Sequence, residues 1–115
     1  MRKAYALIVF FLIIVLPIEI SFAEKPNLML PFSAGEIQNV SRGYGSVTHV
    51  GHDYYAIDFN TSDDCGNITL AAAPGRVETH YGENGGYGNY VDIYHGDKYV
   101  TRYAHLESIS VYDDQ

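Results

Sequence analysis

The sequence predicts an all-β protein built on an antiparallel sheet, in the form of a partial β-sandwich. Its apolar and aromatic residues occur in short runs rich in Val, Ile, Thr and Tyr, and these runs are separated by Gly, Asp and Asn. Beyond the N-terminal stretch, no window of helical length is free of such turn residues. The expected strands are residues 46–50, 54–59, 68–72, 76–81, 89–95 and 98–105.

The N-terminal stretch is typical of a secretory signal peptide. Two basic residues precede an apolar run over residues 4–16, and small residues precede an expected cleavage site after Ala23. A membrane anchor fits less well, because Pro17 and Glu19 interrupt the run before it reaches about 20 apolar residues. Residues 1–23 are therefore expected to be removed, and the mature protein to be secreted, periplasmic or associated with the cell wall.

The rest of the chain is long enough for one domain, near the lower size limit for a self-sufficient core. An irregular lead-in segment, punctuated by Pro and Gly, is expected at residues 24–42. A β-rich domain is expected at residues 43–115.

Charge and cysteine content exclude several classes of function. Without residues 1–23, five Lys and Arg stand against thirteen Asp and Glu. Such an acidic protein is not expected to bind nucleic acid or an anionic membrane surface. Cys65 is the single cysteine, which excludes an internal disulfide and a two-thiol metal site. A free, half-buried thiol is the simplest interpretation of Cys65.

The most clearly predicted local structure is a hairpin between the last two strands, with Gly96 and Asp97 as a two-residue loop. In that register His95 faces Lys98, and side-chain alternation separates a polar face from an apolar one. The polar face holds Asp92, Thr101, Tyr103 and His105. The apolar face holds Val91, Ile93, Val100 and Ala104. The polar face would form the floor of a binding groove, although the eleven tyrosines of the chain are equally typical of strands in general.

Histidines and an aspartate are the residues best suited to chemistry. The candidates are His49, His52, Asp58 and His105. Neutral imidazole and carboxylate bind zinc at about 2.0–2.2 Å, and a hydrolytic zinc site needs three protein ligands and an open position for water. A carboxylate on a partly buried strand, such as Asp58, needs a cation or hydrogen-bond donors. Backbone amides that satisfy Asp58 are an equally good explanation from the pattern alone.

Several motifs in a fixed order resemble one enzyme family. They are THVGHDYYAIDF, the strand AAAPGRV, the segment GYGNYVDIYH and the sequence RYAHL. Over residues 43–111 the chain resembles the lysostaphin-type zinc endopeptidases, which cut peptidoglycan peptides and have a fold called the duplicated hybrid motif. The resemblance implies a β-sandwich of that type, of which residues 43–115 would be the N-terminal part of the catalytic domain.

The resemblance also implies roles for individual residues. Asp58 corresponds to the zinc-ligating aspartate, and His105 to a histidine that assists catalysis beside the metal without binding it. In much of the family the first ligand lies four residues before the aspartate, which here is Tyr54. One branch has a wider spacing, which assigns the first ligand to His49, with His52 as the alternative. That spacing requires the loop at residues 50–53 to bulge. Of the other histidines, His95 corresponds to a structural position and His80 to none.

The chain departs from the family in one respect, because it has no H-x-H motif. In the family the second histidine of that motif is the third zinc ligand. With two ligands, zinc is expected to bind weakly or not at all, and the domain is expected to be C-terminally truncated and inactive alone. Another polypeptide that supplies the missing strands is an expected partner, since unpaired strand edges invite pairing.

Three classes of function remain open. The first is a secreted zinc metalloendopeptidase-family domain acting on peptidoglycan peptides; whether this chain is itself an enzyme stays undecided. The alternative is a non-catalytic module of the same fold that binds the cell wall or regulates a partner. The third, an unrelated secreted adhesin, would be favoured if His49, Asp58 and His105 lay far apart.

Overall fold

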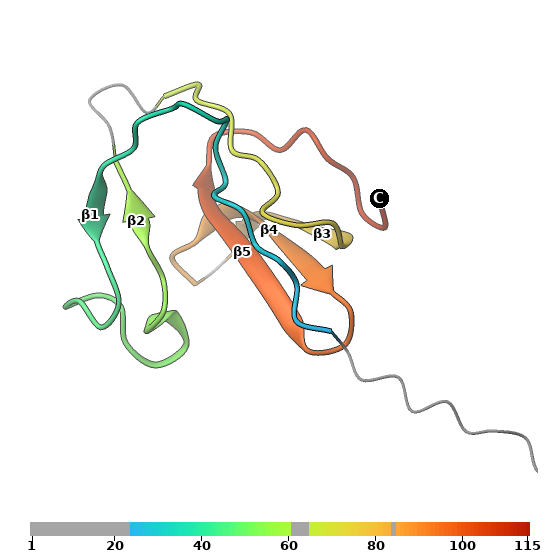
Figure 1. Cartoon of the computed structure of the whole chain (residues 1–115), viewed down its shortest axis with the longest axis horizontal. Coiled ribbons are helices and arrows are strands. Elements are labelled where there is room, and N and C mark those ends of the chain that lie inside the picture. Colours follow the sequence, from blue (N-terminus) through green and yellow to red (C-terminus); the bar gives the residue numbers. More distant parts are fainter. Residues whose placement is uncertain (1–23, 61–64, 84) are drawn as a thin grey trace, which may run out of the picture.

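The computed structural model describes residues 24–60, 65–83 and 85–115, so the expected signal peptide lies outside the described residues (Figure 1). Within these ranges the regular secondary structure consists of antiparallel strands and one 3₁₀ turn. The all-β, antiparallel prediction is therefore confirmed. The described part of the chain contains no helix that could span a bilayer.

Two antiparallel sheets make up the fold, and Figure 1 shows them beside each other. The small sheet pairs β1 (Val40–Arg42) with β2 (Asp58–Phe59), and the 3₁₀ turn η1 (Gly51–Asp53) lies in the loop between them. The large sheet has the order β3-β4-β5. Its strands are β3 (Arg76–Glu83), β4 (Gly88–His95) and β5 (Tyr99–Leu106).

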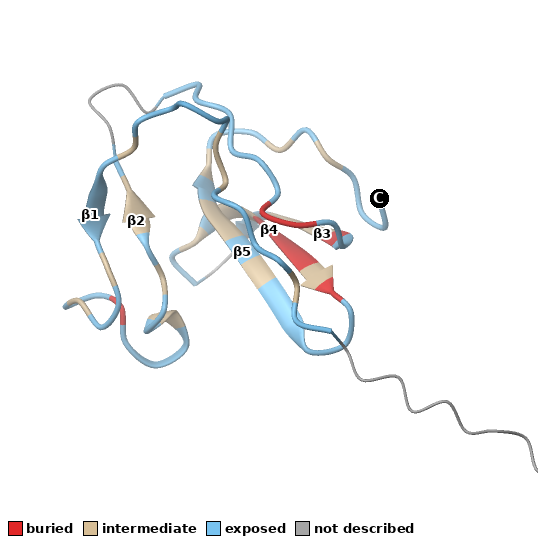
Figure 2. Cartoon of the chain, in the orientation of Figure 1, coloured by how far each residue is buried: buried red, intermediate tan, exposed pale blue. Residues whose placement is uncertain are grey.

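The core lies on one face of the large sheet. Val77 of β3 and Val91 and Ile93 of β4 are buried there, and Figure 2 shows buried residues on β4, on β3 and in the segment that leads into β3. Partly buried apolar side chains pack against this cluster; they are Tyr103, Leu106, Ile109 and Val111. β4 is central because it pairs on both edges, so its alternate residues form the middle of the core.

The hairpin between β4 and β5 differs from the predicted one by one residue. His95 pairs with Tyr99, which makes the loop three residues long, from Gly96 to Lys98. The predicted pairing of His95 with Lys98 is wrong. Gly96 adopts a φ of 69°, a left-handed conformation that glycine accepts without a steric penalty. The observed register also places Thr101 opposite the core residue Ile93.

This shift redistributes the side chains, because a slip of one residue exchanges the faces of a strand. Thr101 and Tyr103 lie opposite Ile93 and Val91, on the core side, while Asp92 lies opposite Arg102 on the other face. The predicted groove floor of Asp92, Thr101, Tyr103 and His105 is therefore not formed.

The strands predicted before residue 76 are wrong or shorter than expected. Residues 46–50 do not form a strand, since residues 47 and 48 lie in a turn and the others have no regular structure, and residues 68–72 do not form one either. Backbone hydrogen bonds tie the second of these segments to the lead-in segment, because the Leu70 amide donates to Pro31 and the Met29 amide donates to Ala72. Of the predicted strand 54–59 only β2 is formed. The lead-in segment is not irregular throughout, since it ends in β1.

The C-terminal residues cover the outer edge of β3. The Asp114 amide donates to the Val77 carbonyl at 3.0 Å, and the Asp113 carboxylate accepts hydrogen bonds from the Thr79 amide and hydroxyl at 2.6 and 2.7 Å. Figure 1 shows this segment curving back beside β3. Covering that edge reduces the tendency of the sheet to pair with another chain.

Candidate metal centre

The small sheet brings His49 and Asp58 together although nine residues separate them. The pairing of β1 with β2 closes the loop, and the Gly45 amide donates to the Tyr54 carbonyl at 2.9 Å across it. The excess length is taken up by η1 at Gly51–Asp53. The predicted bulge at residues 50–53 therefore exists and has the form of a 3₁₀ turn.

The His49 side chain is buried, with 6% of the residue exposed, and both of its ring nitrogens face oxygen atoms. Nδ1 lies 3.0 Å from the Gly43 carbonyl oxygen, and Nε2 lies 3.0 Å from Oδ1 of Asp58. A carbonyl oxygen only accepts, so Nδ1 must carry a proton. Nε2, which faces the carboxylate, is therefore the nitrogen without a proton when His49 is neutral.

This arrangement has a consequence for the charge between the two side chains. In neutral His49 the Nε2 lone pair would face a carboxylate oxygen, which places two acceptors 3.0 Å apart. A cation or an additional proton between them removes that conflict. A histidine that donates from Nδ1 to a backbone carbonyl and presents Nε2 is also the usual arrangement of a metal ligand. The residues present thus fit a divalent metal ion such as zinc.

Asp58 has a second charged neighbour. Its Oδ2 lies 3.3 Å from Nη1 of Arg42, directly across the small sheet. More than half of the Arg42 side chain is exposed, so this ion pair contributes little to stability. Arg42 is nevertheless a protein cation positioned at the carboxylate that a metal would use.

His52, the alternative first ligand, lies exposed in η1. In the described part of the chain it forms no hydrogen bond or ion pair with His49 or Asp58. Within the same ranges, no group of three or more His, Cys, Asp or Glu side chains is placed to hold a metal ion. Among the described residues the pair of His49 and Asp58 is therefore not extended to a complete metal site.

His105 lies at the end of β5 in an unusual backbone conformation. Its φ is 60°, and the β4–β5 register shifts between Asn89 and Val91, so His105 lies at a β-bulge. A left-handed conformation costs a residue with a Cβ roughly 1–2 kcal/mol. Such conformations cluster at functional sites, where the surrounding structure holds them. The His105 side chain is exposed, and its amide donates to the Tyr87 carbonyl at 2.8 Å.

Residues 49–115 match Peptidase family M23, a range that begins at the buried histidine of this centre and covers more than half of the chain. The chain belongs to this family. M23 peptidases are generally zinc-dependent, which agrees with the donor atoms of His49 and Asp58.

One curated relative of this M23 chain is similar over a short range. It is the Outer membrane antigenic lipoprotein B of Histophilus somni, 48% identical over 50 residues, which are 44% of this chain and 15% of that protein. The chain thus spans a small part of that relative's length. No solved structure matches the chain.

Two further residues of this M23 chain, Asp53 and Tyr87, contact each other beside the candidate centre, and neither was predicted from the sequence. The Tyr87 hydroxyl donates to Oδ1 of Asp53 at 2.7 Å, and this bond raises the pKa of Tyr87 above 10.0. Asp53 lies four residues after His49, the spacing found in much of the family, and that spacing could have identified it. In the structure, however, the carboxylate that faces His49 is that of Asp58.

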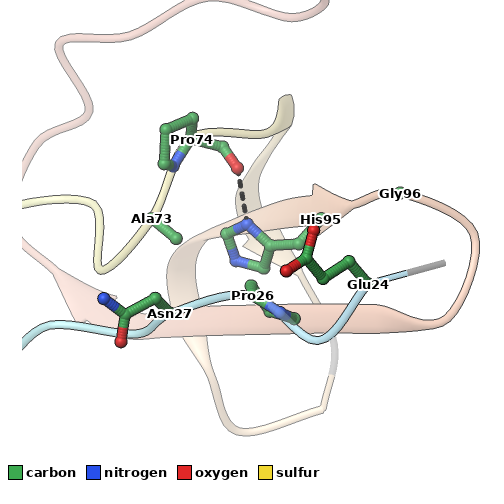
Figure 3. A pocket seen from close by; sticks show the side chains of 7 residues that line it. All are labelled: Glu24, Pro26, Asn27, Ala73, Pro74, His95 and Gly96. Atoms are coloured by element: carbon green, nitrogen blue, oxygen red, sulfur yellow. Dashed lines mark hydrogen bonds between the residues drawn. The ribbon is translucent and has the colours of Figure 1, made fainter.

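The other two histidines lie in the large sheet. His95 is buried; its Nδ1 donates to the Pro74 carbonyl at 2.7 Å and its Nε2 lies 2.9 Å from Oγ1 of Thr101, so neither nitrogen is free to bind a metal. Figure 3 shows His95 against Pro74 at the wall of a shallow pocket of about 390 Å³. His80 stacks on Tyr90, with ring centroids 4.2 Å apart.

Proposed function

We propose that this chain is a domain of a secreted zinc metalloendopeptidase that acts on peptidoglycan peptides. In this proposal His49 and Asp58 are two zinc ligands and His105 assists catalysis. The observation that carries it is the 3.0 Å approach of Nε2 of His49 to Oδ1 of Asp58, in a chain that belongs to Peptidase family M23. Bound zinc would supply Lewis acidity and an activated water.

Each side chain has a distinct task in the proposed site. The Gly43 carbonyl fixes the tautomer and orientation of His49, so that its Nε2 lone pair is available. Asp58 supplies an anionic oxygen beside it. His105 presents an exposed imidazole that can hold a proton near the scissile carbonyl of a bound peptide.

The proposed place of action is the cell envelope. The leading residues have the composition of an export signal, and the relative named above is called an outer membrane lipoprotein. The acidic composition argues against nucleic acid as a partner. A peptidoglycan peptide or the cell-wall surface is the proposed partner.

We further propose that this chain alone binds zinc weakly and does not hydrolyse peptides. Two ligands leave at least two positions of a four-coordinate ion to water, whereas a hydrolytic site has three protein ligands. Within the described ranges no third ligand joins the pair. A third ligand would have to come from outside these ranges or from another polypeptide that adds strands to the sheet.

Calorimetric zinc titration of the chain tests this assignment. The expected result is binding weaker than about micromolar that is lost in His49→Ala and in Asp58→Asn. His52→Ala is the matched control, since His52 lies in the same loop, and it should bind zinc as the parent does. Unchanged binding in His49→Ala would refute the ligand assignment, and tight binding together with peptide hydrolysis would refute the proposed inactivity.

A second candidate function is a non-catalytic module that binds the cell wall or regulates a partner. The ion pair between Arg42 and Asp58 favours it, because a protein cation already lies 3.3 Å from the carboxylate. This function predicts binding to purified peptidoglycan that is unaffected by a chelator and by Asp58→Asn. Binding that requires zinc would exclude it.

A further inference from the structure

Tyr87 lies in the turn between β3 and β4 and contacts both His105 of β5 and Asp53 of the loop between β1 and β2. We propose that Tyr87, acting through Asp53, is a positioning residue that fixes His105 relative to the His49–Asp58 pair. The proposal rests on the function proposed above for those three residues. It assigns to Tyr87 a role in the geometry of the site and not in the chemistry itself.

The first contact is made by the Tyr87 backbone. Its carbonyl accepts a hydrogen bond from the His105 amide at 2.8 Å, at the position where β5 bulges and φ is 60°. A left-handed backbone persists where neighbouring contacts hold it. The Tyr87 carbonyl is such a contact, so the direction of the His105 side chain depends on where Tyr87 lies.

The second contact is made by the Tyr87 side chain. Its hydroxyl donates to Oδ1 of Asp53 at 2.7 Å, and Asp53 is the last residue of η1. η1 lies in the loop that carries His49 and leads to Asp58. Asp53 is itself held in that loop, because its amide donates to Val50 and its carbonyl accepts from Ala56. Tyr87 is therefore hydrogen-bonded through its backbone to His105 and through its side chain to the loop that carries His49.

This connection matters because the strands themselves do not make it. Among the described elements, strands contact one another only within each sheet, β1 with β2 and β4 with β3 and β5. Figure 1 shows the β3–β4 turn reaching from the large sheet toward the small one. The contact between Tyr87 and Asp53 thus ties the small sheet to the end of the large sheet that carries His105.

The Tyr87 ring is also held from its own sheet. The Arg102 guanidinium lies over the ring, 4.7 Å from its centroid, and the Tyr90 ring lies 5.5 Å away. Arg102 is fixed in turn by two hydrogen bonds, of 2.8 and 2.7 Å, to the buried carboxylate of Asp92. A side chain whose conformation is restrained by packing and by supporting hydrogen bonds can hold a neighbouring group in place. Tyr87 meets that condition.

Four variants of the chain test the proposal, with two readouts. Tyr87→Phe removes the hydroxyl and keeps the ring and carbonyl, and Asp53→Ala removes the acceptor. Asp53→Asn is the conservative rescue, because its amide oxygen still accepts from the phenol. Tyr81→Phe is the matched control, since Tyr81 is an exposed tyrosine of β3. The readouts are the exchange rate of the His105 amide and the paramagnetic shift of the His105 ring protons on addition of Co²⁺.

The expected result is that Tyr87→Phe and Asp53→Ala each raise the exchange rate of the His105 amide by about fivefold, the change expected from the loss of one hydrogen bond. Both variants should also alter the cobalt-induced shift at the His105 ring, while Asp53→Asn and Tyr81→Phe leave both readouts within about twofold of the parent. A general loss of stability would raise exchange throughout the sheet and would not be rescued by Asp53→Asn. That result would overturn the proposal.

The two readouts separate this proposal from the proposed function. If cobalt causes no shift in the parent chain while exchange at His105 responds to Tyr87→Phe, the metal assignment fails and the positioning contact stands. If exchange at His105 is unchanged in both Tyr87→Phe and Asp53→Ala, the positioning role is refuted whether or not the metal binds.

Discussion

The Nε2 atom of His49 and the Oδ1 atom of Asp58 lie 3.0 Å apart, while the other ring nitrogen of His49 is bound to the Gly43 carbonyl. Two acceptors would meet there if His49 were neutral and no cation were present. The site is thus better suited to a positive charge between the two residues than to their direct contact. This property leads to the first prediction.

Asp58→Asn should leave the metal-free protein at least as stable as the parent while abolishing its response to zinc. The side-chain amide that this substitution introduces can donate to the Nε2 lone pair of His49, which removes the conflict between acceptors and a carboxylate ligand together. Thermal unfolding with and without excess zinc checks this, because a ligand that binds only the folded state raises its melting temperature. A zinc-dependent rise in Asp58→Asn equal to that of the parent would contradict the prediction.

Arg102→Ala should be among the most destabilising substitutions in the large sheet. The Asp92 side chain is 6% exposed and is bound by Arg102 through both oxygens, so the variant leaves a buried carboxylate without its partner. Breaking a buried pair on one side costs about 3–5 kcal/mol, although the partial exposure of Arg102 places this case at the lower end. Urea unfolding measures the effect.

A second substitution serves as the control for this pair. Asp92→Asn combined with Arg102→Ala removes the charge that Arg102→Ala leaves behind, so the double variant should be more stable than Arg102→Ala alone. Equal or lower stability of the double variant would show that the loss came from packing over Tyr87 and Tyr90 and not from the charge.

The contact between Tyr87 and Asp53 should weaken at alkaline pH. The hydrogen bond to Asp53 raises the pKa of Tyr87 from its usual value of 10.0, so the folded state holds this proton more tightly than the unfolded state. Its contribution to stability is complete below 10.0 and is lost as the pH rises through the higher pKa of the folded state. Between about pH 8 and about pH 11, Tyr87→Phe should therefore lose less stability than the parent. Equal losses in the two proteins would contradict this.

Acid should loosen the C-terminal segment from β3. Hydrogen bonds from the Thr79 hydroxyl and amide lower the pKa of Asp113 below 3.8, so this contribution to stability is present above 3.8 and is lost as the pH falls through the lower pKa of the folded state. Asp113→Asn keeps an acceptor for Thr79 without the titration. It should lose less stability than the parent between about pH 6 and about pH 2, as measured by thermal unfolding.

Much of the large sheet could be predicted from the sequence. The strands around Val77, Val91 and Ile93 alternate apolar and polar residues, and this pattern gave their extent to within one or two residues. The register of the β4–β5 hairpin could not be predicted in the same way, because Gly96 and Asp97 suit a two-residue loop and also the observed three-residue loop. Because the register differs by one residue, Thr101 lies on the core face of the sheet and not on the face of the expected groove.

The small sheet was harder to predict, because its strands are two or three residues long and β1 is exposed. The expected strands at 46–50 and 68–72 had suitable composition but no partner strand. Residues 68–72 instead form a backbone hydrogen bond to the lead-in segment, from the Leu70 amide to the Pro31 carbonyl, and the path of that segment has no local signal in the sequence.

The candidate site was partly predictable. The resemblance of THVG and YAIDF to one branch of the family paired His49 with Asp58, and the structure brings these two side chains together; their role as zinc ligands stays a prediction. The contact between Tyr87 and Asp53 links residues 34 positions apart and has no local signal in the sequence. His105 was identified from its motif, but its bulge arises from the register of two strands and could not be read from RYAHL alone.

The left-handed backbone at position 105 makes the choice of residue there dependent on whether the His105 imidazole has a function. Glycine and asparagine adopt φ near 60° at lower cost than histidine, so His105→Gly should raise the free energy of unfolding by up to about 1 kcal/mol while removing the imidazole. A protein with no further need of that imidazole would therefore gain stability from a single substitution. Homologous domains that have abandoned hydrolysis should accumulate glycine or asparagine at this position, and hydrolytic ones should retain histidine.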